Sequence, residues 1–150
     1  MSQLFDLLKE FDIAKFLPEM DAATRQLGGW FRFALLIGPL VLAGLGAWLY
    51  YAPPDEANYA VGYRSQWSMS GLPVWRYSQK YAGKLYLSYG GIAAGVILVL
   101  SLFFGPLGLM ETAVISLICI LAEIVLMILL NRHIERHIRR KFDQNGDPRK

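Results

Sequence analysis

Charged side chains are missing from three long stretches of the chain. Residues 33–52 and 85–110 contain no Asp, Glu, Lys or Arg, and residues 112–131 contain Glu123 alone. A helix needs roughly 20 apolar residues to cross a hydrocarbon core of about 30 Å. The pattern therefore predicts an all-α membrane protein with three transmembrane helices, at about 33–51, 85–105 and 112–131.

The segments between the predicted spans divide the chain further. Pro53 and Pro54 end the first span, and Gly105, Pro106 and Gly108 fit only a tight turn between the second and third. We expect an N-terminal segment at 1–29, a three-span membrane domain at 30–131 and a basic tail at 132–150. Within the membrane domain, residues 55–84 form a polar connection, called the motif loop below.

The N-terminal segment alternates apolar and charged positions as an amphipathic helix does. Leu4, Leu7, Leu8 and Phe11 fall on one face at about 100° per residue. We expect this helix over about 2–17, followed by a second short helix that begins at Pro18 and ends near residues 28–29. Such a segment lies at the lipid headgroups or packs on protein.

The composition excludes a soluble domain. Of the 150 residues, 55% are hydrophobic and 18% charged, and the mean hydropathy is +0.34. Three spans leave no room for a separate soluble enzyme domain, so we expect neither catalysis nor a cofactor. Cys119 is the single cysteine, which excludes an intramolecular disulfide.

The chain has a net charge of +3, and the positions of its basic residues indicate membrane topology. Lys and Arg number seven in the tail, four in the motif loop and four before the first span, so they flank the spans and do not indicate a nucleic-acid partner. Because Lys and Arg are retained on the cytoplasmic side, we predict that the C-terminus and the motif loop face the cytoplasm. The tail residues expected to contact anionic lipid are Arg132, Arg136, Arg139, Arg140 and Lys141.

The motif loop interleaves aromatic rings with cations, and two interpretations stay open. The favoured one is an anchor at the membrane interface, with Pro73 starting a short helical turn that presents Trp75 and Tyr81. The other is a defined turn around Tyr63 and Arg64. In that turn, Arg64 binds a phosphate or carboxylate, or caps a neighbouring helix.

The same loop resembles the signature of the SdpI family of bacterial membrane proteins. The residues that carry the resemblance are Gly62, Tyr63, Arg64, Ser65, Ser68, Met69, Trp75, Lys80, Tyr81, Ala82, Gly83 and Lys84. Family members typically have Thr, Pro and Asn where Ser65, Gln66 and Gly71 stand here. The resemblance implies a non-enzymatic role in the bacterial inner membrane, because the namesake protects a bacterium from its own secreted toxic peptide and holds a cytoplasmic repressor at the membrane.

Glu123 lies near the middle of the third predicted span, where a charge costs about 2.5 to 3.5 kcal/mol. We expect its carboxyl group to face the bundle, to be protonated, or to find a donor such as Ser88, Ser101 or a tyrosine. An interhelical hydrogen bond is the favoured interpretation, and a proton or ligand site is the alternative.

Two further patterns concern helix faces. Ala43 and Ala47 in the first span, and Gly91 and Gly95 in the second, are small residues four apart, which allow close helix packing within the chain or with a partner. His133 and His137 are also four apart. The cations around these histidines repel a metal ion, so we expect no metal site.

Three functional hypotheses remain. The first is immunity to a secreted toxic peptide, or related envelope protection, with that peptide or a cytoplasmic regulator as partner alongside the lipid bilayer. The second is an accessory subunit of a larger membrane complex, formed through the small-residue faces. The third is a small transporter that uses Glu123.

Overall fold

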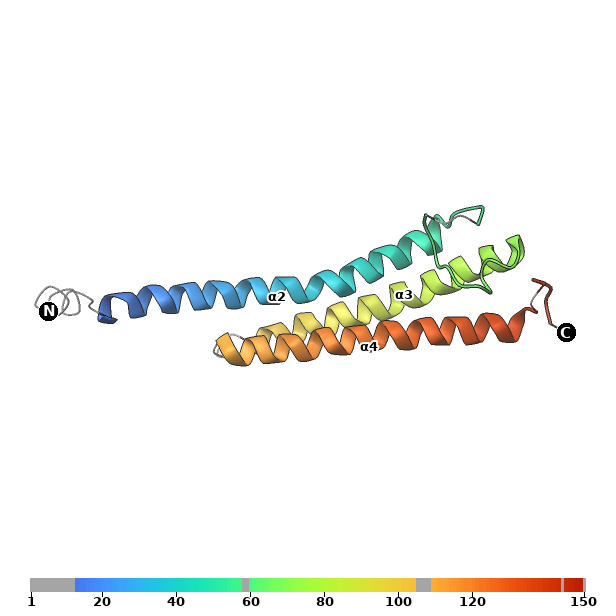
Figure 1. The fold of residues 1–150 in the computed structure, drawn as a ribbon. Coiled ribbons are helices and arrows are strands. Elements are labelled where there is room, and N and C mark those ends of the chain that lie inside the picture. Colours follow the sequence, from blue (N-terminus) through green and yellow to red (C-terminus); the bar gives the residue numbers. More distant parts are fainter. Residues whose placement is uncertain (1–12, 58–59, 105–108, 144, 150) are drawn as a thin grey trace, which may run out of the picture.

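The computed structural model describes residues 13–57, 60–104, 109–143 and 145–149. These residues form three long helices and one short 3-10 helix, with their connections. The long helices are α2 (Ile13–Tyr51), α3 (Leu72–Ser101) and α4 (Leu109–Lys141), and the 3-10 helix is η1 (Leu102–Phe104). The chain reverses direction between α2 and α3 and again between α3 and α4 (Figure 1). Helix α2 packs on both of the other long helices, most closely on α3. All three are long and apolar enough to cross a membrane, which confirms the predicted all-α, three-span class.

All three helices are longer than the hydrocarbon core. At 1.5 Å per residue they measure about 58, 45 and 50 Å, against a core of about 30 Å. The N-terminal end of α2 extends past the ends of α3 and α4 (Figure 1). At the opposite end, α3 and α4 both continue beyond their apolar stretches and meet the connection from α2.

The predicted break before the first span is wrong. Residues from Ile13 through Gly28 and Gly29 to Tyr51 form one uninterrupted helix, so no second helix begins at Pro18. Glycine in a helix interior costs only about 1 kcal/mol and keeps its N–H group, so the flanking apolar residues carry the helix through. The amphipathic helix expected at 2–17 falls mostly outside the described residues.

The motif loop is also shorter than predicted. Helix α3 begins at Leu72 and not near residue 85, with Pro73 in its first turn, as the fixed φ angle of proline allows. The expectation that Pro73 starts a helix is confirmed, but that helix continues unbroken into the second span. Its buried face follows helical spacing and includes Trp75, Gln79 and Ala82.

Close packing of α2 on α3 depends on three glycines. A Cβ atom at Gly46 would collide with the α3 backbone at Tyr86 and Leu87, and Cβ atoms at Gly83 and Gly90 would collide with the α2 backbone. By contrast, Gly91 and Gly95 have open space at the Cβ position among the described residues, so they do not face Ala43 and Ala47. These two glycines lie on an outward surface of α3.

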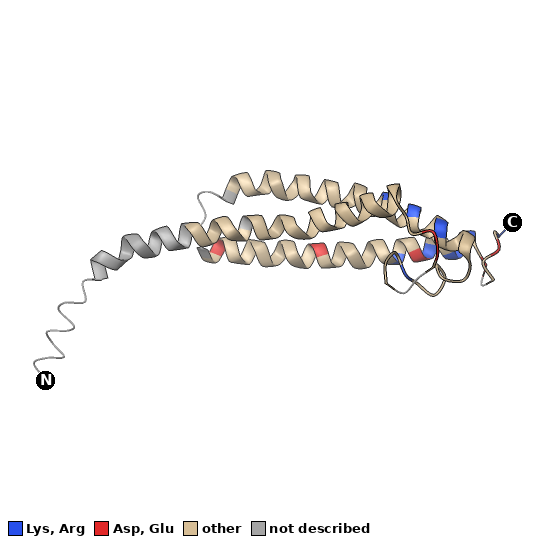
Figure 2. Cartoon of the chain, turned by 90° about the horizontal axis from the view of Figure 1, so that it is seen from above, with Lys and Arg blue, Asp and Glu red and all other residues tan. Residues whose placement is uncertain are grey.

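Apolar side chains are exposed in one part of the bundle and buried in another. In the apolar part of α4, large side chains such as Leu117, Leu121 and Val125 point outward and are more than half exposed. Beyond it, Ile134 and Ile138 are completely buried, in a core that α2, α3 and the connection complete. This end, residues 60–84, 132–143 and 145–149, is called the basic cap. Lys and Arg gather there (Figure 2). Apolar side chains thus face outward in the spans and inward in the basic cap, as lipid and water require.

Candidate functional site

The Gly62–Tyr63 turn is held by a side chain from α3. The amide of Gln79 accepts a hydrogen bond from the Tyr63 N–H group (2.7 Å) and donates one to the Tyr63 carbonyl (2.8 Å). Gly62 has a φ angle of +115°, which side-chain-bearing residues rarely adopt, and a Cβ there would press on Gln79 and Trp75. The turn is therefore a defined structure, as the second interpretation of the motif loop expected.

Ser65 and Ser68 close the next turn by reciprocal hydrogen bonds. The Ser65 N–H donates to the Ser68 hydroxyl (2.7 Å), and the Ser68 N–H donates to the Ser65 hydroxyl (3.0 Å). The buried Ser68 hydroxyl also donates to the Tyr63 carbonyl (3.2 Å). A hydroxyl at position 65 thus satisfies a backbone donor, which serine does as well as threonine.

Trp75 is not an interfacial anchor. Its side chain is completely buried, and its Nε1–H donates to the carbonyl of Pro54 (2.9 Å), which ties the start of α3 to the end of α2. Tyr81 is half-buried and stacks on His137 with ring centroids 4.1 Å apart. Lys80 is exposed, and Gly83 lies in the α2–α3 contact. The interfacial-anchor interpretation is therefore wrong for Trp75, because indole burial against Pro54 and Gly62 displaces water from a large apolar surface.

Tyr63 connects the turn to α4. Its hydroxyl donates to the Asn131 carbonyl (3.3 Å) and lies 3.5 Å from Oε2 of Glu135. Burial first, and then the Glu135 carboxylate, raise the pKa of this hydroxyl, so it stays a donor in neutral solution. The Tyr86 hydroxyl donates to the Asn131 side chain. Asn131 thus receives hydrogen bonds from two tyrosines on different segments.

The tail helix is engaged with protein on one side. The Nε2 atom of His137 is hydrogen-bonded to the Tyr77 hydroxyl (2.8 Å). The Nε2 atom of His133 is hydrogen-bonded to the Tyr81 hydroxyl (3.2 Å). Among the cations expected to contact lipid, Arg139 forms an ion pair with Glu135 (3.0 Å) and Lys141 lies 3.9 Å from the centre of the Tyr77 ring. All five of these cations are exposed; the other three are Arg132, Arg136 and Arg140.

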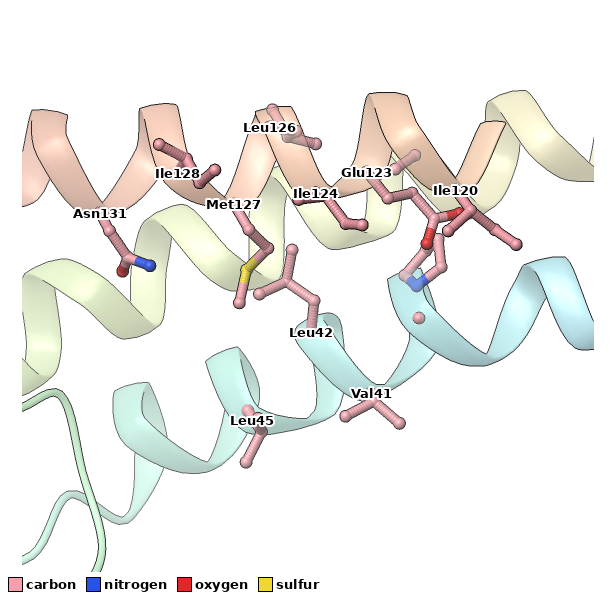
Figure 3. Close-up of a pocket in the computed structure, with 13 residues that line it drawn as sticks. Val41, Leu42, Leu45, Ile120, Glu123, Ile124, Leu126, Met127, Ile128 and Asn131 are labelled. Atoms are coloured by element: carbon pink, nitrogen blue, oxygen red, sulfur yellow. The ribbon is translucent and has the colours of Figure 1, made fainter. Parts of the chain in front are cut away.

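A cleft of about 420 Å³ opens between α2 and α4 within the apolar part of the bundle (Figure 3). Its lining consists of Gly38, Pro39, Val41, Leu42, Leu45, Ala93, Ile120, Glu123, Ile124, Leu126, Met127, Ile128 and Asn131. The Glu123 carboxyl group points from α4 toward α2, where Gly38 leaves space for it. Its buried Oε1 atom has no hydrogen-bond partner within the described residues, so the expected donor from Ser88, Ser101 or a tyrosine is wrong for this atom.

A second cleft of about 490 Å³ adjoins the first at the basic cap. Leu45, Met127 and Asn131 line both clefts, so the two are neighbours. Tyr63 and the exposed Arg64 also line the second cleft. We call the two adjoining clefts together the lateral cleft. Glu123 lines its part within the bundle, and the Gly62–Tyr63 turn lines its part at the basic cap.

The predicted site residues are therefore only partly brought together. Gly62, Tyr63 and Arg64 line the lateral cleft at one end and Glu123 lines it at the other, whereas Lys80 and the exposed tail arginines lie elsewhere. The sequence interpretation did not single out Gln79 or Asn131. The signal for Gln79 was its place on the buried helical face with Trp75, which becomes visible only once α3 is extended back to Leu72.

Comparison with protein-family models matches residues 56–130, half of the chain, to the SdpI/YfhL protein family. The matched range includes the Gly62–Tyr63 turn, all of α3 and the apolar part of α4, and it leaves out α2. No curated protein and no solved structure matches the chain. The motif-loop resemblance and the family match agree, and the chain belongs to the SdpI/YfhL protein family.

Proposed function

We propose that this protein protects a bacterial cytoplasmic membrane from a secreted toxic peptide, by binding and without catalysis. Membership of the SdpI/YfhL family supports the proposal, since the namesake has that role. The observation that carries it is the lateral cleft, which opens on an apolar surface of the bundle. A toxic peptide that acts on membranes has to insert into them, and such a cleft is accessible from within the bilayer.

Binding is preferred to catalysis because of how the polar groups near the cleft are used. The Tyr63 and Tyr86 hydroxyls both bond to Asn131, and Glu123 lies among apolar side chains in the described lining. An isolated carboxyl group in an apolar cleft is suited to recognising one polar group of a ligand.

The proposed orientation places the basic cap in the cytoplasm. Arg64, Arg76, Lys80 and Lys84 from the connection and α3 lie at the same end of the bundle as the tail cations. Lys and Arg near spans are retained on the cytoplasmic side. The cap would then be available to a cytoplasmic regulator, and its exposed arginines to anionic headgroups of the inner leaflet.

A second candidate is an accessory subunit of a larger membrane complex. Gly91 and Gly95 favour it, because they are spaced four apart on an exposed face of α3 with open space at their Cβ positions among the described residues. This arrangement lets another helix approach closely. Mass measurement of the protein extracted from its native membrane separates the candidates: a stable complex with a different chain supports the subunit role.

The direct test of protection is survival of a deletion strain. Deleted cells complemented with the wild type, with Arg64→Ala or with an empty vector are exposed to stationary-phase culture filtrate of the parent strain. We expect the empty-vector cells to lose viability, wild-type complementation to restore it, and Arg64→Ala to restore it only in part. Equal survival of deleted and complemented cells would contradict the protective role.

A further inference from the structure

The rim of the lateral cleft has the form of a groove for one more helix. Val41 and Leu45 on α2, and Ile124 and Ile128 on α4, are each four residues apart and all exposed. They form two apolar ridges with Leu42 and Ala93 between them. Glycines bring α2 and α3 into backbone contact, whereas α2 and α4 pack less closely and leave the first cleft between them. An apolar helix fits such a groove through side chains at helical spacing.

Glu123 places a carboxyl group that needs a hydrogen-bond donor in the lining of the groove. Its Oε1 atom is buried and has no hydrogen-bond partner among the described residues, and the Glu123 side chain is part of the cleft lining. A buried carboxyl group without a partner is costly in an apolar medium. An aliphatic lipid chain would fill the space but would donate no hydrogen bond. An amine would both donate a hydrogen bond and neutralise the charge.

We propose that the groove between α2 and α4 holds an apolar, membrane-inserted peptide helix that places one amine, a lysine side chain or its N-terminus, on Glu123. This inference rests on the proposed function and names the site and the recognised chemistry. Toxic peptides that bind membranes are commonly amphipathic helices rich in Lys and Arg, so a single acid within the bilayer distinguishes them from ordinary apolar segments.

The size of the cleft decides how the peptide lies. A volume of about 420 Å³ is in the range of small-molecule sites and admits side chains but not a whole helix. The helix therefore lies along the exposed rim as a fourth member of the bundle, with its amine reaching inward past Met127 and Ile124. Gly38 is needed opposite Glu123, because a Cβ atom there would occupy the place of the carboxyl group.

The test uses the full chain in phosphatidylcholine vesicles and a synthetic probe helix of about 20 Leu and Ala residues with one central Lys. A photoreactive leucine beside the Lys reports contact, and a matched probe has Leu in place of Lys. We expect the Lys probe to cross-link to the wild type at least about tenfold more than the Leu probe. Glu123→Gln should abolish the difference, whereas Glu111→Gln, at the exposed start of α4, should keep it.

A second variant guards against a folding defect. Val41→Trp fills the groove from its exposed rim and leaves Glu123 in the sequence, and it should lower cross-linking of the Lys probe by about tenfold with unchanged helix content. Equal cross-linking of both probes, or a Lys preference that survives Glu123→Gln, would overturn the inference. Labelling of the cleft by photoreactive phosphatidylcholine alone, or cross-linking of two copies of the chain in place of the probe, would also overturn it.

The survival assay separates this inference from the proposed function. If Glu123→Gln protects cells fully and the Lys probe shows no preference, the protective role stands and the groove proposal fails. If the Lys probe needs Glu123 but deleted cells survive the culture filtrate, the groove proposal stands and the protective role fails.

Discussion

Gln79 hydrogen-bonds both backbone polar atoms of Tyr63, with its side-chain oxygen 2.7 Å from the N–H nitrogen and its nitrogen 2.8 Å from the carbonyl oxygen. The amide therefore acts as a neighbouring strand would, although it belongs to a helix. This one side chain fixes the turn that carries Arg64 to the mouth of the lateral cleft.

Loss of the Gln79 amide should destabilise the basic cap. Gln79→Leu keeps the approximate volume but leaves the Tyr63 N–H group without a partner, at about 1–3 kcal/mol, and leaves the Tyr63 carbonyl with the Ser68 hydroxyl as donor. We expect a lower melting temperature in detergent micelles, followed by tryptophan fluorescence. Gln66→Leu, at an exposed position in the same connection, is the control and should melt like the wild type. Equal melting temperatures of the two variants would mean that the Gln79–Tyr63 hydrogen bonds do not stabilise the basic cap.

Gly62 and Gly71 form a second matched pair. Gly62→Ala forces a side chain into a backbone with φ of +115° and against Gln79, which should cost about 1–3 kcal/mol of unfolding free energy. Gly71 has an extended backbone with φ of −175° and only ordinary van der Waals neighbours, so Gly71→Ala should have little effect. Denaturant titration in micelles measures both. A larger loss for Gly71→Ala would contradict the described turn.

The α2–α3 contact predicts opposite effects for two glycines of the same helix. Gly46→Ala places a methyl group against the α3 backbone at Leu87 and should destabilise the bundle by about 1–3 kcal/mol. Gly44→Ala meets no atom within 4 Å among the described residues and should raise stability by up to about 1 kcal/mol through helix propensity. Comparing melting temperatures of the two variants checks the register of the helix pair.

The outward glycines of α3 test association. Gly91→Leu and Gly95→Leu fill open space among the described residues and should not lower the melting temperature of the single chain; helix propensity should raise it slightly, as for Gly44→Ala. If a partner helix packs there, both substitutions should reduce the share of associated protein in native membranes, as measured by cross-linking and mass. An unchanged share of associated protein would mean that no partner helix packs on the Gly91 and Gly95 face of α3.

The apolar runs correctly predicted three helices that are long and apolar enough to cross a membrane, because lipid imposes a simple requirement of length and charge. The basic cap was harder to predict. Its helix carries Trp75 and Gln79 on a buried face while Arg76 and Lys80 interrupt the apolar pattern. Sequence spacing also indicated small residues without distinguishing the packed Gly90 from the outward Gly91. The burial of Glu123 against Gly38 depends on how α2 crosses α4, which no local pattern records.

The placement of the basic cap can be measured directly by cysteine accessibility. In a Cys119→Ser background, Arg64→Cys and Ile124→Cys are treated with a membrane-impermeant maleimide in intact cells and in inverted inner-membrane vesicles. A three-span bundle with its cap in the cytoplasm predicts that position 64 is labelled only in the inverted vesicles, and that position 124 is labelled in neither preparation. Labelling of position 64 in intact cells would contradict the account.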